Sequence, residues 1–108
     1  MEATPREILL CQDETGREPF TEWLNGLDLQ TRARVRVRID RLEEGLFGDV
    51  EPVGEGVSEL RMDFGPGYRA YFGQVGLEVH LLLGGSKQSQ QKDIRQAKKL
   101  WRSHDDQD

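Results

Sequence analysis

Three cationic side chains in the C-terminal half of the sequence stand at positions where they could hold a phosphate group. Arg61 and Arg69 fall on the polar sides of two alternating segments, and Lys87 follows a third, in the glycine-rich run Gly84–Lys87. Arginine grips phosphate oxygens with two parallel donors, whereas lysine acts as a point charge. A glycine-rich turn leading into a helix adds free N–H groups and the positive end of the helix dipole. The pattern indicates an anion site where these segments meet the next helix.

Other polar side chains share this predicted face. Tyr71 could stack on a base or donate a hydrogen bond, and His80 could take part in acid–base chemistry. Asp93 falls early in the last predicted helix, where a carboxylate suits the helix dipole and could also act as a base. The alternative is a solvated sheet face with cross-strand ion pairs, such as Glu59 or Asp63 with Arg69.

Other kinds of chemistry find little support. The only histidines are His80 and His104, and the one cysteine is Cys11, so the sequence has no zinc-type spacing. It also has no phosphate-binding loop, no dinucleotide fingerprint and no serine nucleophile motif. We expect no metal and no cofactor. Cys11 lies in an apolar run, which favours a small buried hydrophobe and a reducing compartment.

Charge is distributed unevenly along the 108 residues, whose net charge is −5. Residues 1–60 carry 7 basic and 14 acidic side chains, whereas residues 61–102 carry 8 and 3. This favours a local anion site over a broad nucleic-acid platform. No apolar run is long enough to cross a membrane, and Met1–Glu7 lacks the features of a secretory signal. We therefore expect a cytoplasmic protein with no membrane partner.

Hydrophobic periodicity predicts one α+β domain over residues 1–108, with an ordered core at about 6–102 and an acidic tail at 103–108. The predicted order is β-α-α-β-β-β-α, a small, mainly antiparallel sheet with helices packed on one face. Its strands are residues 7–11, 57–64, 68–73 and 77–83; its helices are 19–27, 31–44 and one after Ser89 as N-cap; 47–56 is a loop.

The segment from Thr31 to Glu44 fits two structures. Arginines at 32, 34, 36 and 38 alternate with apolar residues, which is typical of a strand. A helix instead aligns Val35, Ile39, Leu42 and Leu46 on one stripe, and this stripe continues past the alternating part. We predict the helix, with its arginines solvated around the surface.

Several motifs together resemble the RelE/ParE toxin superfamily, most closely the phage-derived, HigB-like addiction module killer proteins. The resemblance covers about residues 6–102. The motifs are Gly56–Arg61, the Gly-Pro-Gly-Tyr-Arg element at 65–69 with Ala70–Phe72, and Leu81–Lys87 followed by Gln90, Asp93-Ile94 and Ala97; Pro19-Phe20, Trp23-Leu24 and Gly45–Asp49 also fit.

The resemblance implies a toxin of a type II toxin–antitoxin system that cleaves mRNA on the ribosome as an endoribonuclease (mRNA interferase). In that chemistry the 2′-hydroxyl attacks the adjacent phosphorus without a metal, and cationic side chains stabilise the added charge. Arg69 matches the family's phosphate-stabilising arginine, Arg61 lies near a basic catalytic position, and Lys87 matches a basic residue that acts as acid or phosphate clamp. Asp93 is the fourth catalytic candidate. The RNA-binding candidates are Tyr71, His80, Gln90 and Lys92. The implied partner is an antitoxin, often a helix-turn-helix protein.

Two positions depart from the RelE-type pattern. Glu59 stands where such enzymes tend to carry a second lysine, and Asp93 stands where some carry a tyrosine. These departures leave two alternatives: a non-enzymatic, ParE-like inhibitor of DNA gyrase, and a degenerate homologue that only binds its antitoxin.

Overall fold

Five strands form one open sheet in the computed structural model, which describes residues 3–105. The elements are β1 (Glu7–Leu10), α1 (Pro19–Asn25), α2 (Leu29–Glu43), β2 (Val50–Gly54), β3 (Val57–Met62), β4 (Tyr68–Val75), β5 (Glu78–Ser86), the short 3-10 helix η1 (Lys87–Ser89) and α3 (Gln90–Asp105). The strand order is β1-β5-β4-β3-β2; β1 runs parallel to β5 and every other pair is antiparallel. The predicted α+β class and mainly antiparallel sheet are confirmed.

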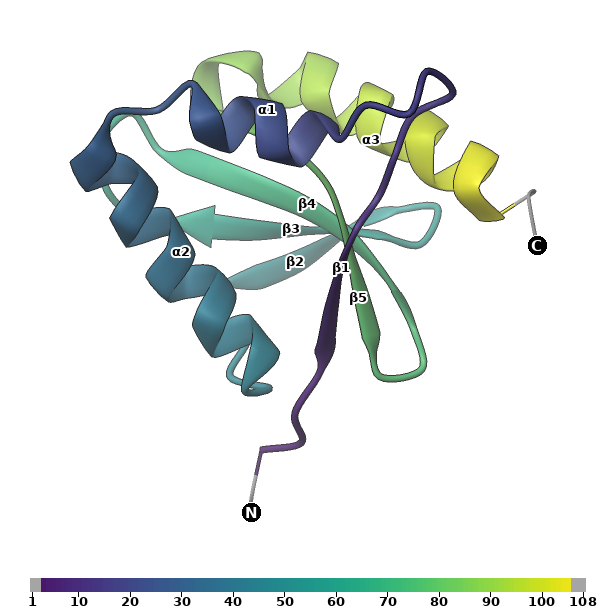
Figure 1. Ribbon diagram of the computed structural model, residues 1–108, viewed down its shortest axis with the longest axis horizontal. Coiled ribbons are helices and arrows are strands. Elements are labelled where there is room, and N and C mark those ends of the chain that lie inside the picture. The colour runs from purple at the N-terminus through teal and green to yellow at the C-terminus, as the bar shows by residue number, and fades with distance from the viewer. Residues whose placement is uncertain (1–2, 106–108) are drawn as a thin grey trace.

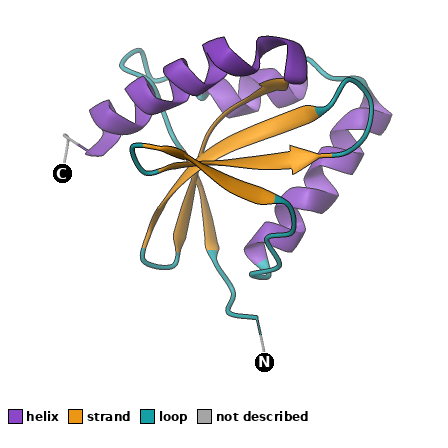
Figure 2. Ribbon diagram, turned by 180° about the vertical axis from the view of Figure 1, so that it is seen from behind, coloured by secondary structure: helices purple, strands orange, loops and turns teal. Residues whose placement is uncertain are grey.

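Helices cover both faces of the sheet, so the prediction that they pack on one face is wrong. Figure 1 shows α1 and α2 in front of the strands, and Figure 2, from behind, shows α3 crossing the opposite face. The helices α1 and α2 therefore cover one face of the sheet, and α3 covers the other. The face predicted to be polar and solvated is largely enclosed.

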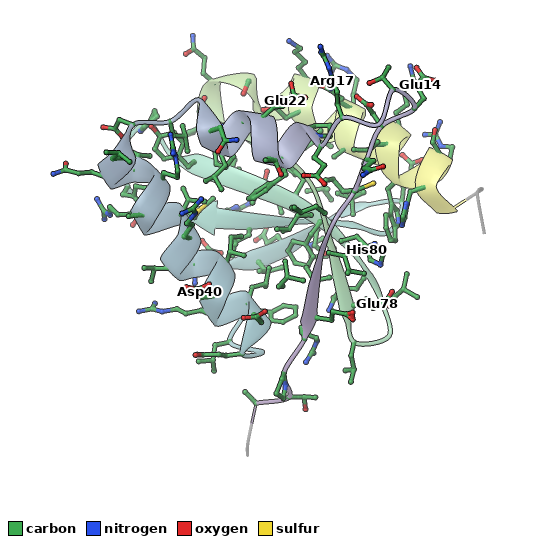
Figure 3. All side chains as sticks on the ribbon, viewed as in Figure 1. Glu14, Arg17, Glu22, Asp40, Glu78 and His80 are labelled. Atoms are coloured by element: carbon green, nitrogen blue, oxygen red, sulfur yellow. The ribbon has the colours of Figure 1, made fainter. Side chains whose placement is uncertain are left out.

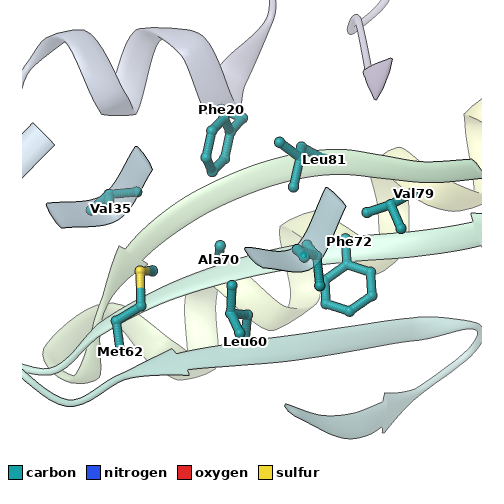
Figure 4. Close-up of a cluster of buried hydrophobic side chains, with 9 residues drawn as sticks. Phe20, Val35, Leu60, Met62, Ala70, Phe72, Val79 and Leu81 are labelled. Atoms are coloured by element: carbon teal, nitrogen blue, oxygen red, sulfur yellow. The ribbon is translucent and has the colours of Figure 1, made fainter. Parts of the chain in front are cut away.

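The core under α1 and α2 is apolar (Figure 4). Phe20 of α1 and Val35 and Leu42 of α2 pack onto the strands. The strands contribute Leu60, Met62, Ala70, Phe72, Val79 and Leu81, at most 1% exposed. These positions alternate along β3 and β4, as the period of two predicted.

A second apolar cluster lies under α3 and explains why this face is covered. Trp101 of α3 packs over Gly73 of β4, where a Cβ atom would come within 2.5 Å of the indole ring. A bulge in β5 between the partners of Tyr71 and Phe72 also places Leu82 and Leu83 in this cluster. Polar residues at alternate positions hid this smaller apolar set from the sequence pattern.

Residues 31–43 are helical, so the predicted helix is confirmed up to its last residue and the strand alternative is wrong. Asp28 caps α2 by accepting a hydrogen bond from the Thr31 amide at 3.0 Å. Leu46 lies beyond the end of the helix and is 50% exposed, so the predicted apolar stripe ends at Leu42.

The predicted loop at 47–56 contains the additional strand β2. It pairs with β3 at the sheet edge, and its register shifts between Pro52 and Gly54. Proline and a bulge are features of edge strands, and they masked the strand in the sequence. The order is therefore β-α-α-β-β-β-β-α.

The ends of the chain differ in part from the predicted boundaries. The helix α3 continues to Asp105, so residues 103–105 of the predicted tail are helical, whereas 106–108 lie outside the described residues. No helix between residues 3 and 105 has both the length and the apolar character needed to cross a bilayer. Cys11 is buried, as predicted; burial and, after it, the charge of Asp13 raise the pKa of its thiol.

Candidate functional site

A buried carboxylate, Glu59 of β3, organises the side chains under the start of α3. Its Oε1 accepts a hydrogen bond from Nε of Arg61 at 3.1 Å. Its Oε2 accepts hydrogen bonds from the Tyr71 hydroxyl at 3.1 Å and from Nε2 of Gln90 at 2.9 Å, and it lies 3.6 Å from Nε of Arg69. The Glu59 side chain is 0% exposed. One carboxylate thus gathers groups from β3, β4 and α3.

The two predicted arginines are neighbours in the sheet. Arg61 and Arg69 face each other in the β3–β4 register. Arg61 is 35% exposed and also pairs with Glu51 of β2 at 2.8 Å. Arg69 is 12% exposed, and its Nη1 donates to the Gly67 carbonyl at 3.0 Å. Within residues 3–105, Nε of Arg69 is buried and has no hydrogen-bond acceptor, because the Glu59 oxygen at 3.6 Å is too distant.

Ion pairing across the strands is the alternative that the sequence left open, and it is present. Glu59 pairs with both Arg61 and Arg69. The carboxylate accepts a hydrogen bond from Arg61 and lies close enough to Arg69 to offset the charge of both arginines. The two arginine side chains are therefore held in position, and the net positive charge of the site is smaller than the sequence suggested.

Lys87 lies beside Arg69 at the end of β5. A Cβ atom on Gly67 would lie 3.2 Å from Nη1 of Arg69 and 3.4 Å from Cβ of Lys87. Both side chains therefore border the Gly67 turn, and Lys87 is exposed. The three predicted cations do gather at one edge of the sheet; we call Arg61, Arg69 and Lys87 the cationic edge.

The glycine-rich run before Lys87 is strand and not an anion-binding loop. Gly84 lies under the Trp23 ring of α1, and Gly85 lies under Asp93 of α3, on the opposite face. A side chain at either position would overlap these groups. The glycines are needed because helices approach the strand closely from both sides.

Hydrogen bonds within the protein already engage the polar groups of Ser86, Ser89 and Asp93 at the start of the last helix. Ser89 is not the N-cap predicted; Ser86 caps η1 instead, and Ser89 bonds to both the Ser86 amide and its carbonyl at 3.3 Å. The Ser89 hydroxyl also donates to Oδ2 of Asp93 at 2.5 Å. Asp93 is 8% exposed, so the structure places it as a buried group that braces this turn.

The four predicted RNA-binding residues are not brought together. Tyr71 is fully buried and cannot stack on a base; burial and then the charge of Glu59 raise the pKa of its hydroxyl. His80 is 7% exposed at the other end of β5, where Nε2 lies 3.1 Å from Glu78 (Figure 3). Gln90 is held by Glu59, and Lys92 is exposed on α3. Lys92 alone among the four presents an exposed side chain.

One surface hollow lies away from the cationic edge. Its volume is about 320 Å³, and residues between β1 and α1 and from the C-terminal half of α3 line it, including Asp13, Lys99 and His104. None of the three side chains of the cationic edge lines this hollow. Among the described residues, no three His, Cys, Asp or Glu side chains are grouped so as to hold a metal ion.

Sequence reasoning missed the central role of Glu59. It considered Glu59 as a surface residue pairing with Arg69 and as a departure from a family pattern. No local signal in the sequence pointed to its burial, because that burial depends on β2, which was predicted as a loop, and on Gln90 of α3, which lies on the face predicted to be solvated.

The fold and site define a small α+β protein with a cationic edge organised by a buried carboxylate. No family model matches the chain. An uncharacterized protein of Haemophilus influenzae is 49% identical to it over 83 residues, which cover 75% of this chain and 84% of that protein. The chain belongs to the same family as this Haemophilus protein.

Proposed function

We propose that this protein is the toxin of a type II toxin–antitoxin system and cleaves mRNA on the ribosome without a metal ion. The observation that carries the proposal is the placement of Arg61, Arg69 and Lys87 at one sheet edge, although 25 residues lie between the first and the last. The resemblance of its motifs to the RelE/ParE superfamily supports it. We propose that the fold is the RelE-like one.

Arg69 is the group that binds the scissile phosphate in this proposal. The Gly67 carbonyl accepts a hydrogen bond from Nη1, the Glu59 carboxylate lies 3.6 Å from Nε, and Nη2 is the nitrogen that donates to the phosphate in this proposal. A donor held in place before the reaction stabilises developing charge without reorganising, and one such donor is commonly worth about 3 kcal/mol in related reactions. Arg61, in register beside it, adds a second positive charge.

Lys87 supplies the proton in this proposal. The RNA 2′-oxygen attacks the adjacent phosphorus while a solvent water molecule takes the proton of the 2′-hydroxyl, the bond from phosphorus to the 5′-oxygen breaks, and the Lys87 ammonium protonates that oxygen. The products are a 2′,3′-cyclic phosphate and a 5′-hydroxyl end. Asp93 acts here as a positioning residue, because its carboxylate is buried and bonded to Ser89.

The partners follow from the same surface. Lys92, in the first turn of α3, extends the contact with the RNA backbone in this proposal. We propose that a cognate antitoxin of the helix-turn-helix type covers the cationic edge with acidic side chains, through charge complementarity. The protein then acts in the cytoplasm and needs no cofactor.

Induction in a bacterial host without the antitoxin tests this proposal. Wild-type protein is expected to arrest growth, and Arg69→Ala and Lys87→Ala are expected to relieve the arrest while Lys99→Ala on α3 does not. Circular dichroism must show that each variant is folded. Growth arrest that is equal in all four proteins would overturn the assigned roles.

One observation favours a second candidate function. Glu59 offsets the charge of both arginines, which suits a protein that binds but does not catalyse, such as a ParE-like gyrase inhibitor or a homologue that only binds its antitoxin. A supercoiling assay with purified gyrase separates these candidates. Inhibition at equimolar protein would favour the gyrase inhibitor over the nuclease.

A further inference from the structure

The outward side of α2 carries an apolar stripe bordered by arginines. Leu29, Ala33 and Val37 are spaced by four residues, so they follow one another along the helix surface. Leu29 is 78% exposed and Val37 is 50% exposed. The buried side of the helix carries Val35 and Leu42 instead. This second apolar stripe is not needed for packing within the chain.

A groove runs beside this stripe, between α2 and the turn after β3. Its volume is about 220 Å³, and its lining consists of Arg34, Val37, Arg38, Arg41 and Phe64. The guanidinium of Arg34 lies over the Phe64 ring, 4.1 Å from its centroid. Aliphatic and aromatic surface thus lies within a rim of guanidinium groups. We call the stripe and this groove the outer α2 surface.

Three exposed arginines of α2 have no acidic partner, although the chain is rich in acidic residues. The sequence has 20 acidic residues, yet within residues 3–105 no carboxylate lies within 4.0 Å of Arg34, Arg36 or Arg41. Elsewhere Arg17 and Arg102 each have one. The α2 helix thus carries three exposed arginines without a carboxylate partner between positions 34 and 41, and within residues 3–105 α3 carries Lys92, Arg95 and Lys99 without one.

Two other arginines of α2 have a structural role, which sets the remaining three apart. Arg32 donates to the carbonyls of Asn25 and Leu27, at the end of α1. Arg38 donates to the Phe47 carbonyl at 3.4 Å. The exposed arginines have no comparable role. Asp40, near the end of α2 (Figure 3), is the first acidic residue of this helix.

We infer that the outer α2 surface binds an acidic amphipathic helix of a partner protein. Apolar side chains of that helix would cover Leu29 and Val37 and enter the groove, and its flanking carboxylates would pair with the arginines. Arginine and aromatic residues are enriched at such interfaces. The exposed apolar centre and the net charge of −5 favour a protein over a nucleic acid.

This inference does not depend on the proposed nuclease chemistry. The α2 helix lies on the opposite face of the sheet from Glu59 and α3. A variant of the outer α2 surface can therefore lose partner binding while the cationic edge is unchanged. Failure of one proposal leaves the other standing.

Fluorescence anisotropy with designed peptides tests the inference on the full-length protein. The probe is a labelled 18-residue helical peptide with leucines on one face and glutamates beside them. A peptide of the same composition with its leucines spread around the helix is the control, and a 20-nucleotide single-stranded RNA is the competing ligand. Backbone amide NMR shifts then locate the bound probe.

We expect the amphipathic probe to bind about tenfold more tightly than the control peptide, with shifts confined to residues 29–41 and Phe64. Loss of two exposed ion pairs in Arg34→Gln/Arg41→Gln should weaken binding about fivefold, whereas Arg95→Gln on α3 should change it less than twofold. Equal affinity for both peptides, shifts outside this surface, or tighter binding of the RNA to α2 would overturn the inference.

Discussion

Removing the charge of Glu59 is expected to destabilise the fold more than almost any other polar substitution. In Glu59→Gln the side chain keeps its shape, but its new amide group places donors opposite those of Tyr71 and Gln90. Arg69, with 12% of its side chain exposed, is left without a counter-charge. The hydrogen-bond mismatch and the unpaired charge act in the same direction.

The size of the effect follows from the burial of the pair. Removing one partner of a buried ion pair costs about 3 to 5 kcal/mol. Because glutamine keeps one acceptor oxygen, we expect a loss of about 3 kcal/mol. With an unfolding entropy of about 2.1 cal/mol/K for each of 108 residues, this loss lowers Tm by about 13 °C.

Calorimetry and urea unfolding at pH 7 measure this loss directly. Glu51→Gln is the matched control, because Glu51 pairs with the same Arg61 but its side chain is 58% exposed. An exposed ion pair contributes little, so the control should change Tm by less than about 4 °C. If Glu59→Gln lowered Tm no more than Glu51→Gln, the carboxylate would not hold this network together.

Three further predictions concern the stability of the fold. Gly84→Ala, which forces a methyl group against Trp23, is expected to cost about 2 kcal/mol in urea unfolding. Tyr71→Phe is expected to cost about 2 kcal/mol at pH 7. Since burial raises the pKa of Tyr71 in the fold, its contribution is complete below pH 10 and fades above it, so unfolding curves of wild type and variant should converge in alkali. The side chain and amide of Thr31 hold the pKa of Asp28 below its usual range; the stabilisation lost in Asp28→Ala should therefore be present at pH 7 and vanish as the pH falls below about 4.

Periodicity predicted the elements that have a clear apolar side. Leu60 and Met62 in β3, and Ala70 and Phe72 in β4, alternate and lie in the core, as expected. The same period assigned the other face to solvent because Glu59 and its neighbours are polar. That assignment was wrong, since polar side chains can be buried when they form hydrogen bonds with one another.

The packing position of α3 could not be predicted from local sequence patterns. It depends on Gly73 and Gly85, whose missing side chains admit Trp101 and Asp93. A glycine in a strand shows that something approaches closely, but the approaching element is known only once the fold is assembled. The proximity of Arg61, Arg69 and Lys87 was predictable, because antiparallel register follows from the short turns.

Mapping of transcript 5′ ends on translating ribosomes tests the central claim, phosphate chemistry by Arg69 and Lys87, most directly. RNA is taken before and after induction, and ends are ligated with and without prior phosphorylation to distinguish 5′-hydroxyl from 5′-phosphate ends. We predict new 5′-hydroxyl ends, at fixed codon positions, for wild type and Lys99→Ala but not for Lys87→Ala or Arg69→Ala. New cuts that persist unchanged in both variants, or an absence of new 5′-hydroxyl ends in wild type, would contradict the claim.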